Sequence, residues 1–259
     1  MYKRRYASQR IRGKLLVNRY LSASRKLKPL IPRTAWFSLS NLESMMNRFD
    51  AVYLKPDVGS LGKGIFRLSR SESGFELYEI KDNLQLYAAF GTLAEAYEHV
   101  DLARTSRLII QEAVALDRLD GRPYDIRVMV QRRRRGPWVC TGFMVKVGAE
   151  GKIVTNYHQG GELITMDRLG DLLALSAEQT DGRIRQLKRT ALRISRTLSA
   201  RRSGMHEMGI DFAYDDKQRL WVLEVNSNHP QFHPLKELDP HAYDRMMRFA
   251  ASYGRRSAE

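Results

Sequence analysis

Residues 208–230 carry apolar side chains at every second position on both sides of a short polar segment, residues 215–217. The alternating positions are Ile210, Phe212 and Tyr214 before that segment and Trp221, Leu223 and Val225 after it. A period of two is typical of β-strands, and a polar segment between two such runs is typical of a tight turn. The pattern therefore predicts a β-hairpin, around which we expect the rest of the chain to be organised.

Other parts of the chain also have patterns that indicate regular structure. The predicted helices are residues 3–28, 40–49, 92–105, 178–203 and 241–253, with Ser40 and Glu43 as a capping box for the second. The predicted strands outside the hairpin are residues 51–56, 65–69, 75–80, 85–90, 108–114, 124–132 and 138–147. Strand pairs and helices follow one another in separate runs rather than in βαβ alternation, which predicts an α+β fold.

The length of 259 residues suits one large or two small domains, and 43% hydrophobic residues can form a sizeable core. We expect a short helical and extended N-terminal segment at residues 1–50. A small α+β unit would follow at residues 51–111, and a larger one, carrying the hairpin, at residues 112–259.

The chain is strongly basic, with 44 Lys and Arg against 29 Asp and Glu and a formal net charge of +15. Such an excess favours anionic partners, although each basic run is equally well explained as a solvated surface. No zinc-finger or base-stacking motif accompanies the charge, so we expect no specific nucleic-acid partner, and non-specific nucleic-acid binding is a minor alternative.

Cys140 is the single cysteine, which excludes an internal disulfide bond and suits a reducing compartment. The N-terminus is basic but has no uninterrupted apolar core, so it does not resemble a secretory signal. No apolar run approaches membrane-spanning length. These features predict a cytoplasmic protein.

Oxygen-bearing side chains interrupt the apolar pattern of the hairpin. Glu224 and Asn226 lie two residues apart, so they point to the same face of an extended strand, and Asp211 on the paired strand can reach that face. Two carboxylates and an amide oxygen suit Mg²⁺ held together with substrate phosphates. The structural alternative is an ordinary hairpin with a solvated polar face, but a carboxylate in the apolar run around Glu224 would be largely buried and would need a partner.

A glycine-rich loop follows the strand at residues 51–56. It begins after Lys55 and contains the candidate phosphate-binding residues Gly59, Ser60, Gly62, Lys63 and Gly64. Glycines allow backbone N–H groups to approach phosphate oxygens, and Lys55 supplies a positive charge. The spacing is not that of a P-loop, and a plain hairpin turn would also explain these glycines.

Charged residues also interrupt the strands at 124–132 and 138–147. Asp125 and Arg127 share one strand face, Lys146 is placed similarly, and Asn156 lies in a following loop with two glycines. Each could belong to a structural ion pair. Taken together, however, a cationic cradle followed by a metal-binding hairpin is the equipment that phosphoryl transfer needs.

The order and spacing of these segments resemble the ATP-grasp superfamily, and most of all its YheC/YheD-like family of endospore coat-associated proteins. The resemblance runs from about residue 30 to residue 247. The segments that carry it are AVYLKPDVGSLGKGIFRL, IIQEAVAL, DGRPYDIRVMVQR, WVCTGFMVKV, IVTNYHQGG and GIDFAYDDKQRLWVLEVNS. It implies an ATP-grasp fold in which two α+β subdomains clasp the nucleotide, and an activity that uses ATP and Mg²⁺.

The resemblance also implies residue roles. Lys55 and Lys146 would bind ATP phosphates, and residues 59–64 would form the lid over them. Arg127 would also contact phosphate. Arg127 and Lys146 would be the catalytic residues. Adenine would lie against Gln111, Glu112 and Val114, ribose would meet Asp125, and Asn156 would also belong to the nucleotide site. Asp211, Glu224 and Asn226 would hold Mg²⁺.

Two departures from the superfamily pattern are visible. Many ATP-grasp ligases carry an arginine two residues before the first metal aspartate, where this chain has Gly209, so Arg127 or another cation would have to replace it. Only about 50 residues precede Lys55, so the front substrate domain is expected to be truncated, with an acceptor site that is either rudimentary or supplied by a partner protein.

The resemblance favours a ligase that joins a carboxylate, such as a peptide or acidic polymer, to an amine through an acyl-phosphate. The alternatives are a spore-associated structural protein that retains nucleotide binding and a kinase on the same fold. His229 and His233 are candidate acid or base groups, although surface histidines are the commoner explanation.

Overall fold

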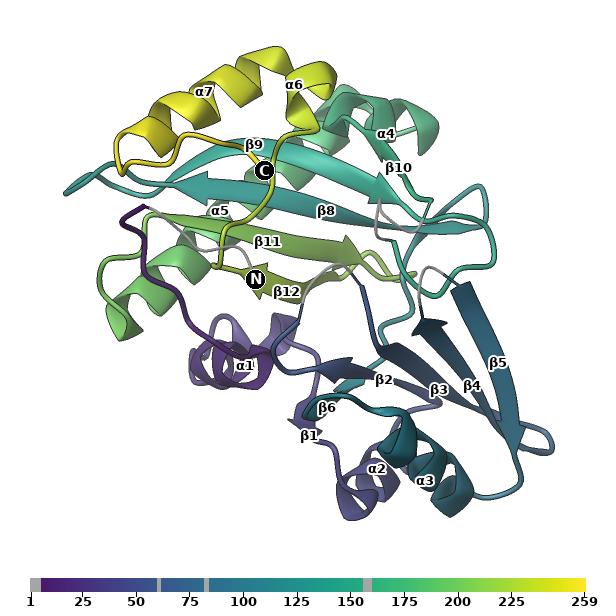
Figure 1. Ribbon diagram of the computed structural model, residues 1–259. Coiled ribbons are helices and arrows are strands. Elements are labelled where there is room, and N and C mark those ends of the chain that lie inside the picture. Colours follow the sequence, from purple (N-terminus) through teal and green to yellow (C-terminus); the bar gives the residue numbers. More distant parts are fainter. Residues whose placement is uncertain (1–5, 60–61, 82–83, 156–159) are drawn as a thin grey trace.

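The computed structural model describes residues 6–59, 62–81, 84–155 and 160–259, and two antiparallel sheets organise this part of the chain (Figure 1). The first sheet has the strand order β1-β6-β2-β3-β4-β5. Its strands are β1 (Thr34–Trp36), β2 (Ala51–Pro56), β3 (Ile65–Ser71), β4 (Gly74–Lys81), β5 (Leu84–Phe90) and β6 (Leu108–Glu112). Helices α2 (Leu39–Met46) and α3 (Leu93–Ala103) cover one face, where Leu42, Val100 and the alternate strand residues Val52 and Leu54 form a core.

The second sheet has the strand order β10-β9-β8-β11-β12, with β7 paired to β8. Its strands are β7 (Arg118–Leu119), β8 (Arg122–Gln131), β9 (Val139–Val147), β10 (Glu162–Ile164), β11 (Glu207–Tyr214) and β12 (Leu220–Asn226). The predicted hairpin is confirmed, because β11 and β12 pair in antiparallel register with Asp211 opposite Glu224. All eight residues of β11 are buried, since this strand lies between β8 and β12, whereas β12 ends the path of strands.

Helices cover the second sheet unequally on its two faces (Figure 1). On one face α1 (Lys14–Ser22), the 3-10 turn η1 (Lys28–Leu30), α4 (Met166–Leu172) and α5 (Ala177–Arg201) pack on a large core. On the other face α6 (Leu235–Leu238) and α7 (Pro240–Ala251) cover a smaller core that includes Met129 and Met144. Because side chains alternate along β8, Ile126 and Val128 point to the large core while Asp125, Arg127 and Met129 share the opposite face.

The N-terminal helix is shorter than the pattern predicts. The prediction of a helix over residues 3–28 is wrong at both ends of its described part, since residues 8–13 have no regular secondary structure and α1 runs only from Lys14 to Ser22. Tertiary hydrogen bonds explain the difference: the backbone N–H of Gln9 donates to the carbonyl of Gly204 at 2.7 Å, and that of Ile11 donates to Ser227 Oγ at 3.1 Å. These bonds replace the intrahelical bonds that favourable composition alone would allow.

The second helix also starts earlier than predicted. Its cap is Ser38, whose side chain accepts a hydrogen bond from the backbone N–H of Asn41, so the prediction of Ser40 as the cap is wrong. The longer helices α3 and α5 follow the predicted positions closely, and both begin with capping boxes, Thr92 with Glu95 and Ser176 with Gln179. None of the described helices combines the length and the apolar composition of a membrane-spanning segment.

The two sheets are joined directly through the segment that follows β9. The Tyr53 hydroxyl on β2 donates a hydrogen bond to the carbonyl of Ile153 at 2.6 Å. Gln85 on β5 accepts from the backbone N–H of Ile153 and donates to the carbonyl of Gly151, both at 2.8 Å. These contacts set the two sheets on either side of a common cavity.

The turn between β3 and β4 requires glycine at residue 74. Gly74 has φ +136°, and a Cβ at this position would lie 2.3 Å from the carbonyl oxygen of Phe90. Gly121 also has a positive φ, +76°, but its Cβ would have nothing within 4 Å. Backbone strain alone predicts that Gly121→Ala lowers the free energy of unfolding by about 1–2 kcal/mol. Gly74→Ala adds overpacking against backbone, so we expect a further loss of about 1–3 kcal/mol.

Denaturant unfolding of the two variants checks this prediction, with Gly121→Ala as the matched control. Equal losses in both variants would show that the close approach of residue 74 to Phe90 has no energetic consequence.

Candidate functional site

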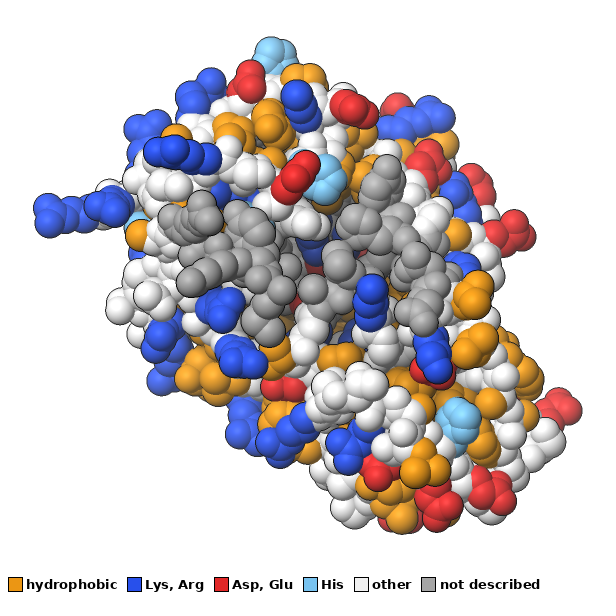
Figure 2. Space-filling model, viewed as in Figure 1, with side chains coloured by type: hydrophobic (Ala, Val, Ile, Leu, Met, Phe, Trp, Pro, Cys, Tyr) orange, Lys and Arg blue, Asp and Glu red, His pale blue; other side chains and the backbone are white. Residues whose placement is uncertain are grey.

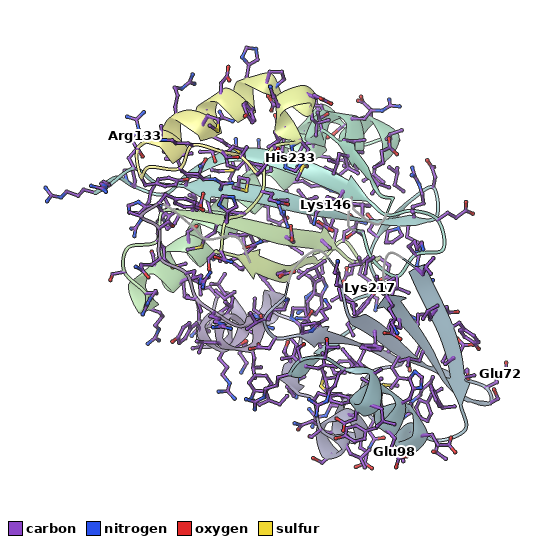
Figure 3. All side chains as sticks on the ribbon, viewed as in Figure 1. Glu72, Glu98, Arg133, Lys146, Lys217 and His233 are labelled. Carbon is purple, nitrogen blue, oxygen red and sulfur yellow. The ribbon has the colours of Figure 1, made fainter. Side chains whose placement is uncertain are left out.

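A row of charged side chains crosses four strands of the second sheet. Arg127 on β8 donates two hydrogen bonds to Asp211 on β11, from Nε to Oδ1 at 2.9 Å and from Nη2 to Oδ2 at 2.8 Å. Lys146 on β9 lies between two carboxylates, 2.7 Å from Asp125 Oδ1 and 3.2 Å from Asp211 Oδ1. Glu224 on β12 continues the row, because it lies opposite Asp211 in register. Figure 3 shows Lys146 over the middle of this sheet.

The position of the row follows from where the helices stop. α6 and α7 cover the end of this face that carries Met129 and Met144. Arg127 lies opposite Met144 in register, and Asp125 lies opposite Lys146, so the polar positions continue the same face past the edge of the apolar core. The side chains of Asp125, Lys146 and Asp211 are 3%, 8% and 7% exposed, and such burial is tolerated because each is paired.

Burial and pairing act in opposite directions on the pKa values of the two aspartates. Burial by itself would raise the pKa of Asp211, but Arg127 and Lys146 outweigh it and lower that pKa to about 2. For Asp125 burial dominates over the attraction of Lys146, so its pKa is raised. Asp125 also accepts a hydrogen bond from the Thr155 hydroxyl. Asp211 is therefore a permanent carboxylate at neutral pH.

Lys55 faces this row from the first sheet. Its Nζ donates a hydrogen bond to Gln111 Oε1 at 2.9 Å, and Gln111 donates in turn to the hydroxyl of Thr34. Burial lowers the pKa of Lys55 to about 8, a shift that the carboxylate of Glu224 partly opposes. The lysine is therefore cationic near pH 7 but close to its titration.

Lys14 is a site residue that the sequence analysis missed. Its Nζ donates to the carbonyls of Pro56 at 3.1 Å and Gly59 at 3.2 Å and lies 3.5 Å from Glu224 Oε1. Gly13 precedes it with φ +97°, and Asp57 accepts a hydrogen bond from the backbone N–H of Leu15, which starts α1 at the cavity. Within a basic stretch, no local signal distinguishes Lys14 from a solvated lysine.

The predicted site residues line one cavity of about 1950 Å³ between the two sheets. Figure 2 shows the hollow at this place, with charged side chains in its floor. The lining includes Lys55, Gly59, Gly62, Lys63, Gln111, Glu112, Val114, Asp125, Arg127, Lys146, Asp211, Glu224 and Asn226. Gly64 is not part of the lining, and Ser60 and Asn156 lie outside the described residues.

The predicted adenine contacts differ in their hydrogen bonding. Glu112 and the following residue, Ala113, already donate their backbone N–H groups to the carbonyls of Arg33 and Ala51. The side chain of Glu112 accepts a hydrogen bond from the backbone N–H of Arg33 at 3.0 Å. Val114 follows directly after these paired residues and also lines the cavity. Of the predicted residues, Val114 is thus the one best placed to offer backbone groups to a ligand.

The donor set on the hairpin suits a divalent cation that prefers oxygen. Asp211 and Glu224 face one another across β11 and β12, and Asn226 shares the strand face of Glu224. Within the described residues no three His, Cys, Asp or Glu side chains form a metal-binding group. Two carboxylates and one amide match the few protein ligands of Mg²⁺, whose remaining positions are filled by water and phosphate.

Glu224 is less buried than the apolar sequence around it predicts. Its side chain is 39% exposed, because the second half of β12 lies at the end of the strand path beside the cavity. Asp211 has the buried environment instead. The hairpin therefore carries one accessible carboxylate, Glu224, and one buried carboxylate, Asp211.

Gly209 and Arg127 are neighbours in space. A Cβ on Gly209 would lie 2.9 Å from Pro230 Cβ and 3.6 Å from Arg127 Cδ, so a large side chain at residue 209 has no room. The guanidinium beside Asp211 comes from β8 instead of from two residues earlier on β11. Arg127 thus supplies the guanidinium beside Asp211, while residue 209 carries no side chain.

Two antiparallel sheets, each with helices on its outer face, enclose a cavity with cations on both sides and carboxylates on one hairpin, and this arrangement defines an ATP-grasp fold. It is similar to the structure of the ATP-grasp ligase PsnB complexed with minimal precursor, with a TM-score of 0.50, 13% identity, and coverage of 92% of this chain and 60% of that one. It is also similar to N5-carboxyaminoimidazole synthetase from Staphylococcus aureus complexed with ADP, with a TM-score of 0.50, 10% identity, and coverage of 84% and 44%.

The chain belongs to the YheC/D-like ATP-grasp family, whose model matches residues 3–255. It is 29% identical over 236 residues to the endospore coat-associated protein YheD of Bacillus subtilis, covering 86% of this chain and 51% of that protein. It is 21% identical over 203 residues to the endospore coat-associated protein YheC of the same organism, covering 78% and 55%. The chain thus spans about half the length of these two relatives.

Proposed function

We propose that this chain is an ATP-dependent ligase that activates a carboxylate as an acyl-phosphate and transfers the acyl group to an amine. The observation that carries the proposal is the charged row on the second sheet, Lys146, Arg127, Asp211 and Glu224, which faces Lys55 across the cavity. Phosphoryl transfer depends mainly on positioned charge, and this row supplies both signs within one enclosed site.

Each side chain has a distinct proposed role. Lys55 and Lys146 neutralise phosphate oxygens from opposite sheets, and Arg127 holds Asp211 in place while it contacts the transferred group. Asp211, Glu224 and Asn226 are the residues that would hold Mg²⁺. When bound, the metal ion supplies positive charge against the negative charge that develops on the transferred phosphate. Asp125 and Thr155 hold Lys146 in the orientation that it has in the row.

A second candidate is a protein that binds nucleotide without turnover and associates with the endospore coat, the location that the names of the relatives give for them. One observation favours it. Asp211 is already paired with both Arg127 and Lys146, so these two cations are engaged before any phosphate arrives. A spore-associated location for this chain is part of the same proposal.

Mass spectrometry of reactions containing ATP, Mg²⁺ and pools of carboxylates and amines separates these functions. ADP together with a product of condensation mass supports the ligase, and a phosphate adduct would identify a kinase instead. ATP binding without turnover on any pool would favour the second candidate.

The pKa of Lys55 predicts a pH dependence of nucleotide affinity. Below about pH 8 the lysine is protonated and attracts phosphate, and above it the charge is lost, so affinity is expected to fall as pH rises. Loss of one charge-assisted hydrogen bond, worth about 1.5–3 kcal/mol, corresponds to a dissociation constant about tenfold higher or more. Titration calorimetry with ADP between about pH 7 and pH 10 measures the effect.

Lys55→Arg is the control variant, because arginine keeps its charge throughout this pH range. Its ADP affinity is expected to change little with pH. The same decline in both proteins would assign the pH dependence to another group.

A further inference from the structure

The N-terminal strap, residues 6–14, forms one wall of the cavity. It has no regular secondary structure before Lys14, yet its residues 6 and 8–14 all line the cavity. Residues 227–234, which follow directly after Asn226, lie against the strap and line the same end of the cavity. This end of the cavity is therefore adjacent to the proposed metal residues but is built from segments outside both sheets.

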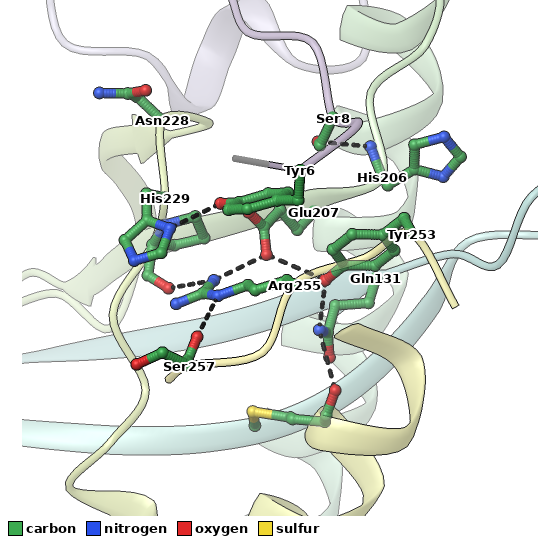
Figure 4. Close-up of polar contacts among 12 residues, drawn as sticks. Tyr6, Ser8, Gln131, His206, Glu207, Asn228, His229, Tyr253, Arg255 and Ser257 are labelled. Carbon is green, nitrogen blue, oxygen red and sulfur yellow. Dashed lines mark hydrogen bonds and ion pairs between the residues drawn. The ribbon is translucent and has the colours of Figure 1, made fainter. Parts of the chain in front are cut away.

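Three anchors hold the strap in place, and Figure 4 shows the two at Tyr6 and Ser8. Tyr6 donates a hydrogen bond to Glu207, which also forms a buried ion pair with Arg255 at 2.7 Å. Ser8 Oγ accepts from the backbone N–H of His206 at 2.9 Å. Arg10 Nη1 donates to Asn228 Oδ1 at 2.5 Å. Together with the hydrogen bond from the backbone N–H of Leu15 to Asp57, these anchors fix the chain on both sides of Arg12.

Of the strap's three cations, Lys14 is paired with Glu224, whereas Arg10 and Arg12 have no acidic partner among the described residues. Residues 6–14 contain Arg10, Arg12 and Lys14 and no acidic residue, and residues 227–234 contain none either. The carboxylates nearby are already engaged, since Asp57 caps α1 and Glu224 lies beside Lys14. The exposed side chain of Arg12 forms no hydrogen bond or ion pair with another described residue.

We propose that the strap and residues 227–234 bind the second substrate, and that this substrate is a polycarboxylate such as an acidic peptide. The inference rests on the proposed ligase function, which requires a carboxylate next to the nucleotide phosphates. Arginine binds carboxylates with paired hydrogen bonds, so Arg10 and Arg12 select a substrate that carries acidic groups beyond the one activated. The cavity volume of about 1950 Å³ exceeds the 300–1,000 Å³ or so typical of a single small-molecule pocket, which leaves room for this substrate beside ATP.

The test is the binding of fluorescently labelled triglutamate to the full chain in saturating ADP and Mg²⁺, at about 0.15 M salt so that distant charges are screened. The variant Arg10→Gln/Arg12→Gln removes two guanidinium groups from the strap. Arg185→Gln/Arg189→Gln is the matched control, because it removes two exposed arginines from α5, on the far face of the second sheet. We expect the strap variant to weaken triglutamate binding about tenfold or more and the control to change it less than about twofold.

Arg10→Lys/Arg12→Lys keeps the charge but loses the paired geometry, and intermediate affinity is expected. Equal weakening in the strap variant and in the α5 control would overturn the proposal, because it would indicate general attraction to a basic protein. Lack of triglutamate binding would also overturn it, as would competition by inorganic phosphate but not by unlabelled triglutamate, which would identify a phosphate site.

ADP affinity measured separately for each protein distinguishes this inference from the ligase proposal. Unchanged ADP affinity with lost triglutamate binding locates the effect in the strap. Parent protein that binds triglutamate but not ADP would contradict the ligase and leave an anion site of another kind.

Discussion

Replacement of Glu224 by glutamine is expected to lower Mg²⁺-dependent turnover of ATP by about 100-fold or more, the effect of losing several kcal/mol of charge stabilisation. The amide keeps the size of the side chain but removes the accessible carboxylate opposite Asp211. The contribution of Mg²⁺ to ATP affinity should fall as well, which titration calorimetry with and without the metal ion measures independently of any turnover.

The fold should survive this change. Glu224 is 39% exposed and its ion pair with Lys14 spans 3.5 Å, so little stability depends on this contact. Glu162→Gln is the control, because Glu162 on β10 pairs with Arg122 and is not part of the cavity lining. Turnover in Glu224→Gln close to that of the control, at matched Mg²⁺, would remove Glu224 from the site.

Replacement of Arg255 by methionine is expected to lower the free energy of unfolding by about 3–5 kcal/mol, the usual cost of breaking a buried ion pair on one side. Arg255 and Glu207 are 1% and 0% exposed, and their 2.7 Å contact connects the segment after α7 to the first residue of β11. Arg255 also donates to the carbonyl of Pro230 at 3.0 Å, so the loop after β12 depends on it too. Chemical denaturation of the purified variant measures the loss.

The double variant Glu207→Gln/Arg255→Met separates the charge effect from lost packing. It removes the uncompensated carboxylate, so it should be more stable than the sum of the two single changes predicts. Additive losses would show that Glu207 and Arg255 contribute independently to stability, although they lie side by side (Figure 4).

Much of the fold was predictable because local patterns agree with tertiary packing. The period-two alternation over residues 208–226 corresponds to β11 and β12, and the predicted helix at residues 178–203 corresponds to α5. The residue types of the charged row were visible for the same reason. Polar residues that interrupt apolar strands at two-residue spacing must share a face and need partners there.

The strap shows where prediction from pattern fails. Its composition suits a helix, but it is held in a non-helical conformation by hydrogen bonds to Gly204 and Ser227, which lie far away in the sequence. The environment of Glu224 is a second case. An apolar sequence predicts burial, but β12 ends the strand path beside the cavity, so the carboxylate is accessible.

The sequence by itself determined the strands, most helices, the α+β class and the donor groups available for phosphate and metal, because these follow from periodicity and side-chain chemistry. Tertiary structure alone decided which of these groups meet. α6 and α7 cover Met129 on β8 but do not extend over Asp125 and Arg127. The same face of β8 therefore changes from apolar core to cavity lining. Arg127 reaches Asp211 from the neighbouring strand, where the two residues are opposite in register, and Lys14 reaches Glu224 from a helix that starts only at the cavity. Such contacts depend on strand order and helix placement, which residues distant in the chain set through packing.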